Sequence, residues 1–157
     1  MTIRALLALI AVGTFAGCAT VARIASLKPS DLAAIETMTY EEDYNVVYAA
    51  AKKAFQDAGY DIATSNRDAG VISTGYRSER MFDPTRAAPF ESRTRASLGV
   101  TNSAERTTVR ARWFWDISDV PGLWHDNGRN WTVSDYRSRL STCFDLVRQN
   151  LAAQPQR

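Results

Sequence analysis

The sequence predicts an α+β domain, in which two helices pack on one face of a four-stranded antiparallel sheet. Two segments, Tyr44–Ala58 and Thr132–Ala152, repeat apolar residues at helical spacing. Between them, four runs alternate apolar and polar residues, as half-buried strands do. The connections between these runs are too short for helical crossovers, so neighbouring strands must be antiparallel.

The first helix has signals at both ends. Thr39-Tyr40-Glu41-Glu42 fits a capping box, in which the Thr39 hydroxyl and the Glu42 carboxylate each accept an unpaired backbone N–H. Gly59 stands where a left-handed residue ends many helices. We therefore expect a helix that begins after Thr39 and ends before Gly59.

The strands are expected as two hairpins. The first joins residues 60–65 and 71–76, and the second joins residues 93–101 and 107–117. Pairing Thr101 with Arg106 across the second turn places Arg95 opposite Arg112. The stretches 77–92 and 118–130 contain prolines and turn signals, and both are expected to be irregular.

Residues 1–17 have the layout of a secretory signal peptide, with Arg4 before a short apolar run. The run is shorter than the roughly 20 residues that span a bilayer. Phe15-Ala16-Gly17-Cys18 resembles a bacterial lipobox, although Phe15 stands where leucine is usual. The resemblance implies that Cys18 is acylated, for example with palmitate, and becomes the new N-terminus. Ala19, where an aspartate would favour inner-membrane retention, implies the outer membrane; a cleaved signal with a chance cysteine and an uncleaved anchor are the alternatives.

The predicted division of the chain follows from this. Residues 1–17 are the signal peptide, 18–38 the lipidated N-terminus and tether, 39–153 a single domain, and 154–157 a disordered tail. Removing residues 1–17 leaves 140 residues, which suffice for one core. If Cys18 is lipidated, Cys143 has no disulfide partner and serves as a small hydrophobe on the apolar face of the last helix.

The folded part resembles the helix-grip domains of small outer-membrane lipoproteins, including the BamC-like ones. The segments Tyr44–Tyr48, Asp57–Ile62 and Gly70–Thr74 carry the resemblance, which covers about a third of the mature chain. It implies the fold, an outer-membrane location and a non-enzymatic role as an accessory in envelope assembly.

The candidate binding surface is a set of arginines on the outward face of the second hairpin. Like charges opposite each other cost roughly 0.2–1 kcal/mol, so something must offset them. Glu79, Glu91 or Asp116 could do so internally, or the face could bind a carboxylate-rich protein, a lipid headgroup or another phosphate. Phe82 and Phe90, in the irregular stretch, are expected as exposed anchors unless they only pin the loop. The whole predicted surface is Arg93, Arg95, Arg110, Arg112, Phe114, Phe82 and Phe90.

Catalysis is not expected, because the chain has one histidine and no nucleophile motif, cofactor motif or phosphate loop. Asp116, Asp119, His125 and Asp126 match no metal-ligand spacing. The sequence thus predicts a protein that is anchored by its lipid in the outer membrane and faces the periplasm. Its predicted role is that of an accessory that binds an envelope protein, and it is not expected to bind nucleic acid. The alternative is a lipoprotein that binds a small ligand or envelope glycan in a groove between helices and sheet.

Overall fold

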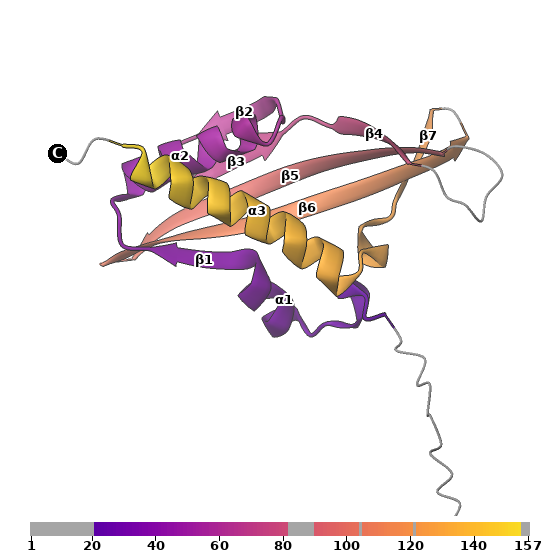
Figure 1. Cartoon of the computed structure of the whole chain (residues 1–157), viewed down its shortest axis with the longest axis horizontal. Coiled ribbons are helices and arrows are strands. Elements are labelled where there is room, and N and C mark those ends of the chain that lie inside the picture. The colour runs from indigo at the N-terminus through magenta and orange to yellow at the C-terminus, as the bar shows by residue number, and fades with distance from the viewer. Residues whose placement is uncertain (1–20, 82–89, 104, 121, 155–157) are drawn as a thin grey trace, which may run out of the picture.

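The computed structural model describes residues 21–81, 90–103, 105–120 and 122–154. These residues form one large antiparallel sheet with helices packed on it (Figure 1). In chain order the elements are η1 (Ile24–Ser26), α1 (Pro29–Glu36), β1 (Thr37–Tyr40), α2 (Tyr44–Asp57), β2 (Ile62–Asn66), β3 (Val71–Thr74), β4 (Arg77–Met81), β5 (Phe90–Ser103), β6 (Arg106–Val120), β7 (Leu123–Asp126), η2 (Gly128–Asn130) and α3 (Val133–Ala152).

The sheet is built around the long hairpin of β5 and β6. Its strands run in the order β1-β6-β5-β3-β2, while β4 pairs with one end of β5 and β7 with one end of β6. The α+β class and the antiparallel sheet are confirmed. The four-strand count is wrong, because the described residues form seven strands.

The three additional strands have a common physical origin. β4 and β7 pair with the parts of β5 and β6 nearest Phe90 and Val120, and β1 pairs with β6 over Thr107–Arg110. All three are short, with four or five residues each, and β4 is largely polar. Backbone hydrogen bonds to the long hairpin hold them, and such bonds leave no alternating apolar pattern.

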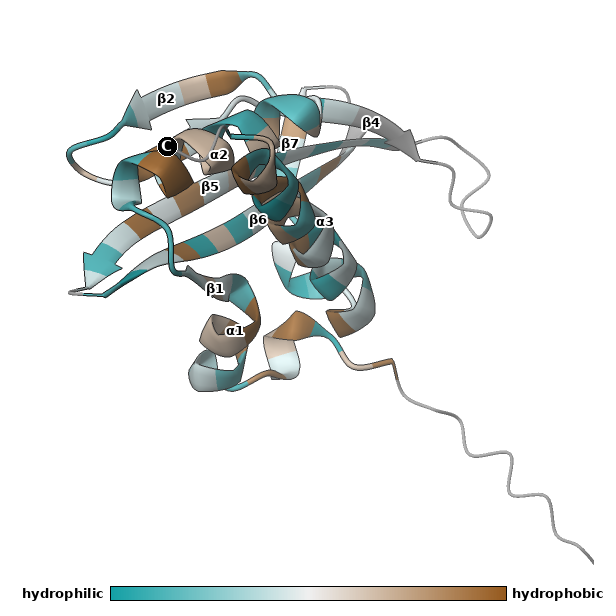
Figure 2. Cartoon of the chain, turned by 60° about the vertical axis from the view of Figure 1, so that its left-hand side comes forward, coloured by the Kyte–Doolittle hydropathy of each residue, from teal (hydrophilic) through white to brown (hydrophobic). Residues whose placement is uncertain are grey.

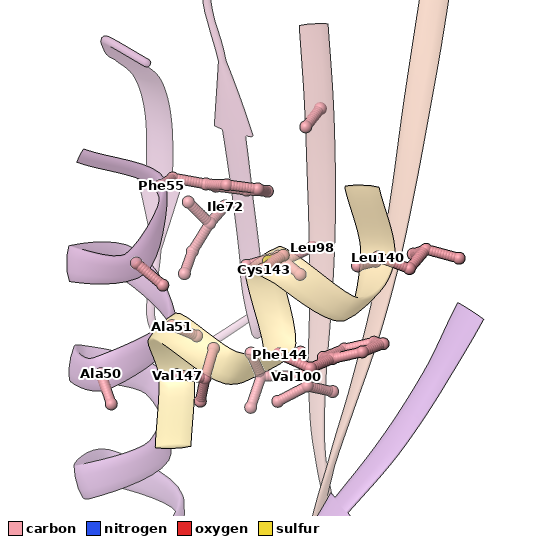
Figure 3. Packing of buried hydrophobic residues seen from close by; sticks show 14 of the residues in the cluster. Ala50, Ala51, Phe55, Ile72, Leu98, Val100, Leu140, Cys143, Phe144 and Val147 are labelled. Atoms are coloured by element: carbon pink, nitrogen blue, oxygen red, sulfur yellow. The ribbon is translucent and has the colours of Figure 1, made fainter. Parts of the chain in front are cut away.

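The core lies between one face of the sheet and the helices α2 and α3. Hydrophobic and polar colours alternate along β5 and β6, as expected for strands with one buried face (Figure 2). Leu98 and Val100 from β5 meet Phe55 from α2 and Phe144 from α3 within the same cluster (Figure 3). The opposite face of the sheet is not covered by α2 or α3.

The start of α2 differs from the expected capping box. Thr39 lies in β1 opposite Thr108, and the N-cap is Asp43, whose Oδ1 accepts a hydrogen bond from the Asn45 N–H at 2.8 Å. Because Thr39 is part of the pairing between β1 and β6, the helix begins four residues later, after Asp43. The end of the helix is as expected, since Gly59 has a φ of 80°.

The segment expected to be a tether is folded against the domain from Ala22 onward. The Ile24 N–H donates to the Trp131 carbonyl at 3.0 Å, and the Val133 N–H donates to the Ala22 carbonyl at 2.9 Å. Apolar side chains that sequence periodicity did not single out pack against the core here: Ile24, Leu32, Ile35 and Met38.

The register of the central hairpin also differs from the prediction. Ser103, not Thr101, pairs with Arg106, so Arg95 faces Phe114 and Arg112 faces Ser97. Because the error is two residues, every side chain keeps its predicted face of the sheet. The expected opposition of Arg95 and Arg112 therefore does not occur.

Candidate functional site

The side chains of four arginines lie near one another on the face of the sheet that α2 and α3 do not cover. Arg93 and Arg95 come from β5, and Arg110 and Arg112 come from β6. Phe114 lies among them, as the strand alternation predicted, and Tyr76 and Trp124 join them from outside the hairpin. We call this set of seven side chains the arginine face.

Glu36 at the end of α1 neutralises two of these arginines. Its Oε2 accepts hydrogen bonds from Arg110 Nε at 2.9 Å, from Arg110 Nη2 at 2.8 Å and from Arg112 Nε at 3.0 Å. The Glu36 side chain is only 3% exposed, while those of Arg110 and Arg112 are 41% and 48% exposed. One buried carboxylate thus holds two arginines whose outer parts remain in contact with water.

A hydrogen bond from the helical layer completes the environment of Glu36. The hydroxyl of Tyr136, in α3, donates to the other carboxylate oxygen of Glu36 at 2.9 Å. Burial first, and then the charge of Glu36 and this hydrogen bond, raise the pKa of Tyr136 above its usual value. Both Glu36 oxygens therefore have donors, as a buried carboxylate requires.

Arg93 is also neutralised, by a different neighbour. Its Nε donates to Asp116 Oδ2 at 3.0 Å, and its guanidinium carbon lies 3.8 Å from the centroid of the Tyr76 ring and 4.1 Å from that of Trp124. Asp116 was one of the acidic residues expected to offset the arginines. The two rings add cation–π contacts, and together these neighbours fix the position of Arg93.

Arg95 has no acidic partner among the described residues. Its guanidinium carbon lies 4.3 Å from the centroid of the Phe114 ring and 5.5 Å from that of Tyr76. Its Nε is buried without a hydrogen-bond partner in the described structure. Stacking on rings occupies the flat faces of a guanidinium and leaves its in-plane N–H groups, which match a carboxylate or phosphate.

The remaining predicted site residues cannot be placed in this way. Cys18 and Phe82 lie outside the described residues. Phe90 is the first residue of β5, opposite Met81, and its side chain is outside the described part. Their predicted roles stay predictions.

The binding surface predicted from the sequence did not include three residues of this region: Glu36, Tyr76 and Trp124. Glu36 lies in the segment interpreted as a tether, and Tyr76 and Trp124 lie at or near stretches interpreted as irregular. The only signal for Glu36 was indirect, because four clustered arginines required a negative charge from elsewhere in the chain.

A separate groove of about 1060 Å³ opens where the start of α2 and the end of α3 approach β1. Its lining contains acidic and basic side chains, namely Glu41, Glu42, Arg67 and Arg148. It lies between the ends of these helices and β1, the edge strand of the sheet. The rest of its lining is largely apolar, and an apolar lining with a few charged groups is typical of ligand pockets.

The other residues considered for chemistry lie apart from the arginine face. Cys143 is buried in the core, and burial raises the pKa of its thiol to about 12. Within the described residues, no three metal-ligating side chains gather as a metal site requires. No helix in that part of the chain combines the length and apolar character needed to cross a bilayer.

Comparisons with known proteins give no family for this chain. No protein-family model matches it, and no curated protein matches it. Among solved structures, it is similar to a DUF4468 family protein from Bacteroides ovatus, with 11% identity, a TM-score of 0.43, and coverage of 77% of this chain and 87% of the other. A TBP-like protein from Parabacteroides distasonis gives 14% identity, a TM-score of 0.34, and coverage of 76% and 92%. At these TM-scores, neither similarity supports a statement about function.

Proposed function

We propose that this protein is a lipid-anchored, periplasm-facing accessory of the outer membrane, which binds an envelope protein through the arginine face and catalyses no reaction. The anchor would be the acylated Cys18 of the lipobox-like motif. The resemblance to helix-grip lipoproteins supports both the location and the accessory role. Phe82 and Phe90 are proposed as further anchors for the partner.

The observation that carries the proposal is that the four arginines differ in whether they have a carboxylate partner. Three of them have carboxylate partners within the chain, Glu36 or Asp116, whereas Arg95 has none among the described residues. Two aromatic rings hold the guanidinium of Arg95 in place. A preorganised arginine loses less side-chain entropy on binding, and arginines beside aromatic rings are frequent hot spots of protein interfaces.

A protein carboxylate is the partner chemistry that fits best. It accepts two parallel N–H groups from the edge of a guanidinium, which gives direction as well as energy. The surrounding rings supply the apolar contact area that a bare phosphate does not use. The expected partner is therefore an acidic segment of an envelope protein.

The proposal is tested by affinity capture of the tagged full chain from detergent-solubilised membranes. We expect a stoichiometric protein partner that is lost with Arg95→Glu and retained with Arg137→Glu, which reverses an exposed arginine on α3. Arg95 is the informative position, because reversing Arg112 would also place a second carboxylate beside Glu36. Capture of the protein alone, or of a partner indifferent to Arg95→Glu, contradicts docking through this face.

The groove beside α2 and α3 favours a second candidate function, the binding of a small charged ligand or an envelope glycan. Its lining offers carboxylates and guanidiniums on opposite elements, which could hydrogen-bond a polar ligand. Binding that Arg148→Ala abolishes and Arg95→Glu leaves unchanged would favour this candidate over docking.

A further inference from the structure

This inference rests on the proposed lipid anchor and concerns how the domain lies relative to the membrane. The first described residues are fixed to the domain. Besides the two backbone hydrogen bonds of Ala22 and Ile24, Arg23 forms a bridge with Thr132 and its Nη1 donates to the Asn130 carbonyl at 2.9 Å. The chain therefore has no freedom to extend after about Ala22.

The length of chain before this point sets the reach of the anchor. Four residue steps separate Cys18 from Ala22, and a fully extended chain covers at most about 3.6 Å per residue, or about 14 Å in total. The tether expected from the sequence, residues 18–38, would have reached about 70 Å by the same rule. An acylated Cys18 sits at the membrane surface, so the domain has to lie directly beside it.

We propose that the end of the domain formed by η1, η2 and the first turn of α3 rests on the headgroup surface of the bilayer. In both cartoons the first described residues lie beside the start of α3, and the β5–β6 turn and the last turn of α3 lie far from them (Figures 1 and 2). The domain then stands with the β5–β6 turn and the last turn of α3 directed away from the membrane.

The side chains at this end are compatible with a headgroup surface. Val21 is 69% exposed, the highest value of any large hydrophobic residue described, and the exposed residues Ala22 and Ala25 lie beside it. Arg23, Lys28 and Arg129 are exposed basic residues of the same region, and Asp31, Asp126 and Asp135 are exposed acidic ones, so the charges balance there. The short anchor, and not a net charge, therefore sets the orientation.

The orientation restricts the partner of the arginine face. Glu36, which binds Arg110 and Arg112, ends α1, the helix that directly follows η1. The arginine face therefore begins close to the membrane-facing end. A protein that docks there has to present its carboxylates near the bilayer, as a membrane protein or a membrane-associated domain does.

The experiment uses the acylated full chain in liposomes of phosphatidylcholine and phosphatidylglycerol that carry a fluorescent acceptor on a small fraction of headgroups. A donor dye is attached to a single new cysteine, Ser26→Cys in η1 or Ser103→Cys at the β5–β6 turn. The native Cys143 is 3% exposed and its pKa is raised to about 12, so it does not compete for the dye. A third protein carries Ser26→Cys and a 16-residue glycine–serine insertion after Ala19.

We expect transfer from position 26 to be at least twofold more efficient than transfer from position 103, and the insertion to reduce transfer from position 26. Mass spectrometry of the N-terminal peptide shows whether the protein is acylated. If it is acylated, then equal transfer from both positions, or no effect of the insertion, overturns the orientation and leaves the anchor intact. An N-terminal peptide without the acyl mass overturns the anchor itself, and the orientation with it.

Discussion

Removing the charge of Glu36 is expected to destabilise the domain, because one carboxylate neutralises two arginines. Breaking a fully buried ion pair costs about 3–5 kcal/mol, whereas exposed pairs contribute about 0–1 kcal/mol. Here the carboxylate is 3% exposed but Arg110 and Arg112 are 41% and 48% exposed, so water can replace part of the lost interaction. For Glu36→Gln we expect a loss of about 2 kcal/mol in the free energy of unfolding, between these limits.

Glu36→Ala is expected to cost more than Glu36→Gln. The alanine variant also removes the acceptor of the Tyr136 hydroxyl, and an unpaired buried hydroxyl adds about 1–3 kcal/mol. The expected total is about 3–5 kcal/mol. Asp31→Asn, which neutralises an exposed carboxylate on the same helix, serves as the matched control and should change stability by less than about 1 kcal/mol.

Urea unfolding followed by far-UV circular dichroism measures all three variants. The midpoint should fall in the order Asp31→Asn, Glu36→Gln, Glu36→Ala, with an unchanged dependence on urea concentration. If Glu36→Gln is as stable as Asp31→Asn, then the contacts of Glu36 with the arginines do not stabilise the fold, and the reasoning is wrong.

Three further predictions concern the turn of the first hairpin, the tyrosines and the aromatic rings of the arginine face. Gly70→Ala should lower the free energy of unfolding by at least about 2 kcal/mol, because the φ of Gly70 is 66° and a Cβ there would lie 2.0 Å from a carbonyl oxygen of β5. The control is Gly99→Ala, where a Cβ would meet open space. In the same urea titration the control should cost less than about 1 kcal/mol. Burial raises the pKa of Cys143 above its ordinary value of 9 and the pKa values of Tyr40 and Tyr136 above 10, so the unfolded chain loses these protons first. The free energy of unfolding should therefore fall as the pH rises above about 9, and more steeply above 10; unfolding midpoints that stay level from pH 9 to 11 would contradict this. Trp124→Ala should lower stability by only about 0.5–1 kcal/mol through its cation–π contact, and a larger loss would show that this ring also supports β7.

The parts of the fold that the sequence predicted are those in which one face of an element is buried. α3 begins after Thr132, whose hydroxyl accepts the Asp135 N–H at 3.0 Å, and its apolar stripe enters the core as expected. The two hairpins were predicted for the same reason, since alternation along a strand reports burial of one side. The two-residue register error left that pattern unchanged, so alternation alone could not have detected it.

The parts that the sequence did not predict depend on contacts between distant segments. β4 and β7 form through backbone pairing with β5 and β6, and backbone pairing has no side-chain signature. Glu36 stabilises Arg110 and Arg112 across more than seventy residues of sequence. The sequence therefore predicted the correct face of the sheet for the four arginines and Phe114, while the distinction between the paired arginines and Arg95 required the structure.

The central claim is that the arginine face binds an envelope protein, and photo-crosslinking in living cells tests it most directly. A photoreactive amino acid replaces Ser97, which lies on the same strand and the same side of the sheet as Arg95, or Ala49, which is exposed on α2. We expect position 97 to give a discrete crosslinked protein that disappears with Arg95→Glu, and position 49 to give none. Crosslinking from position 49 alone, or a product at position 97 that Arg95→Glu leaves unchanged, would contradict the claim.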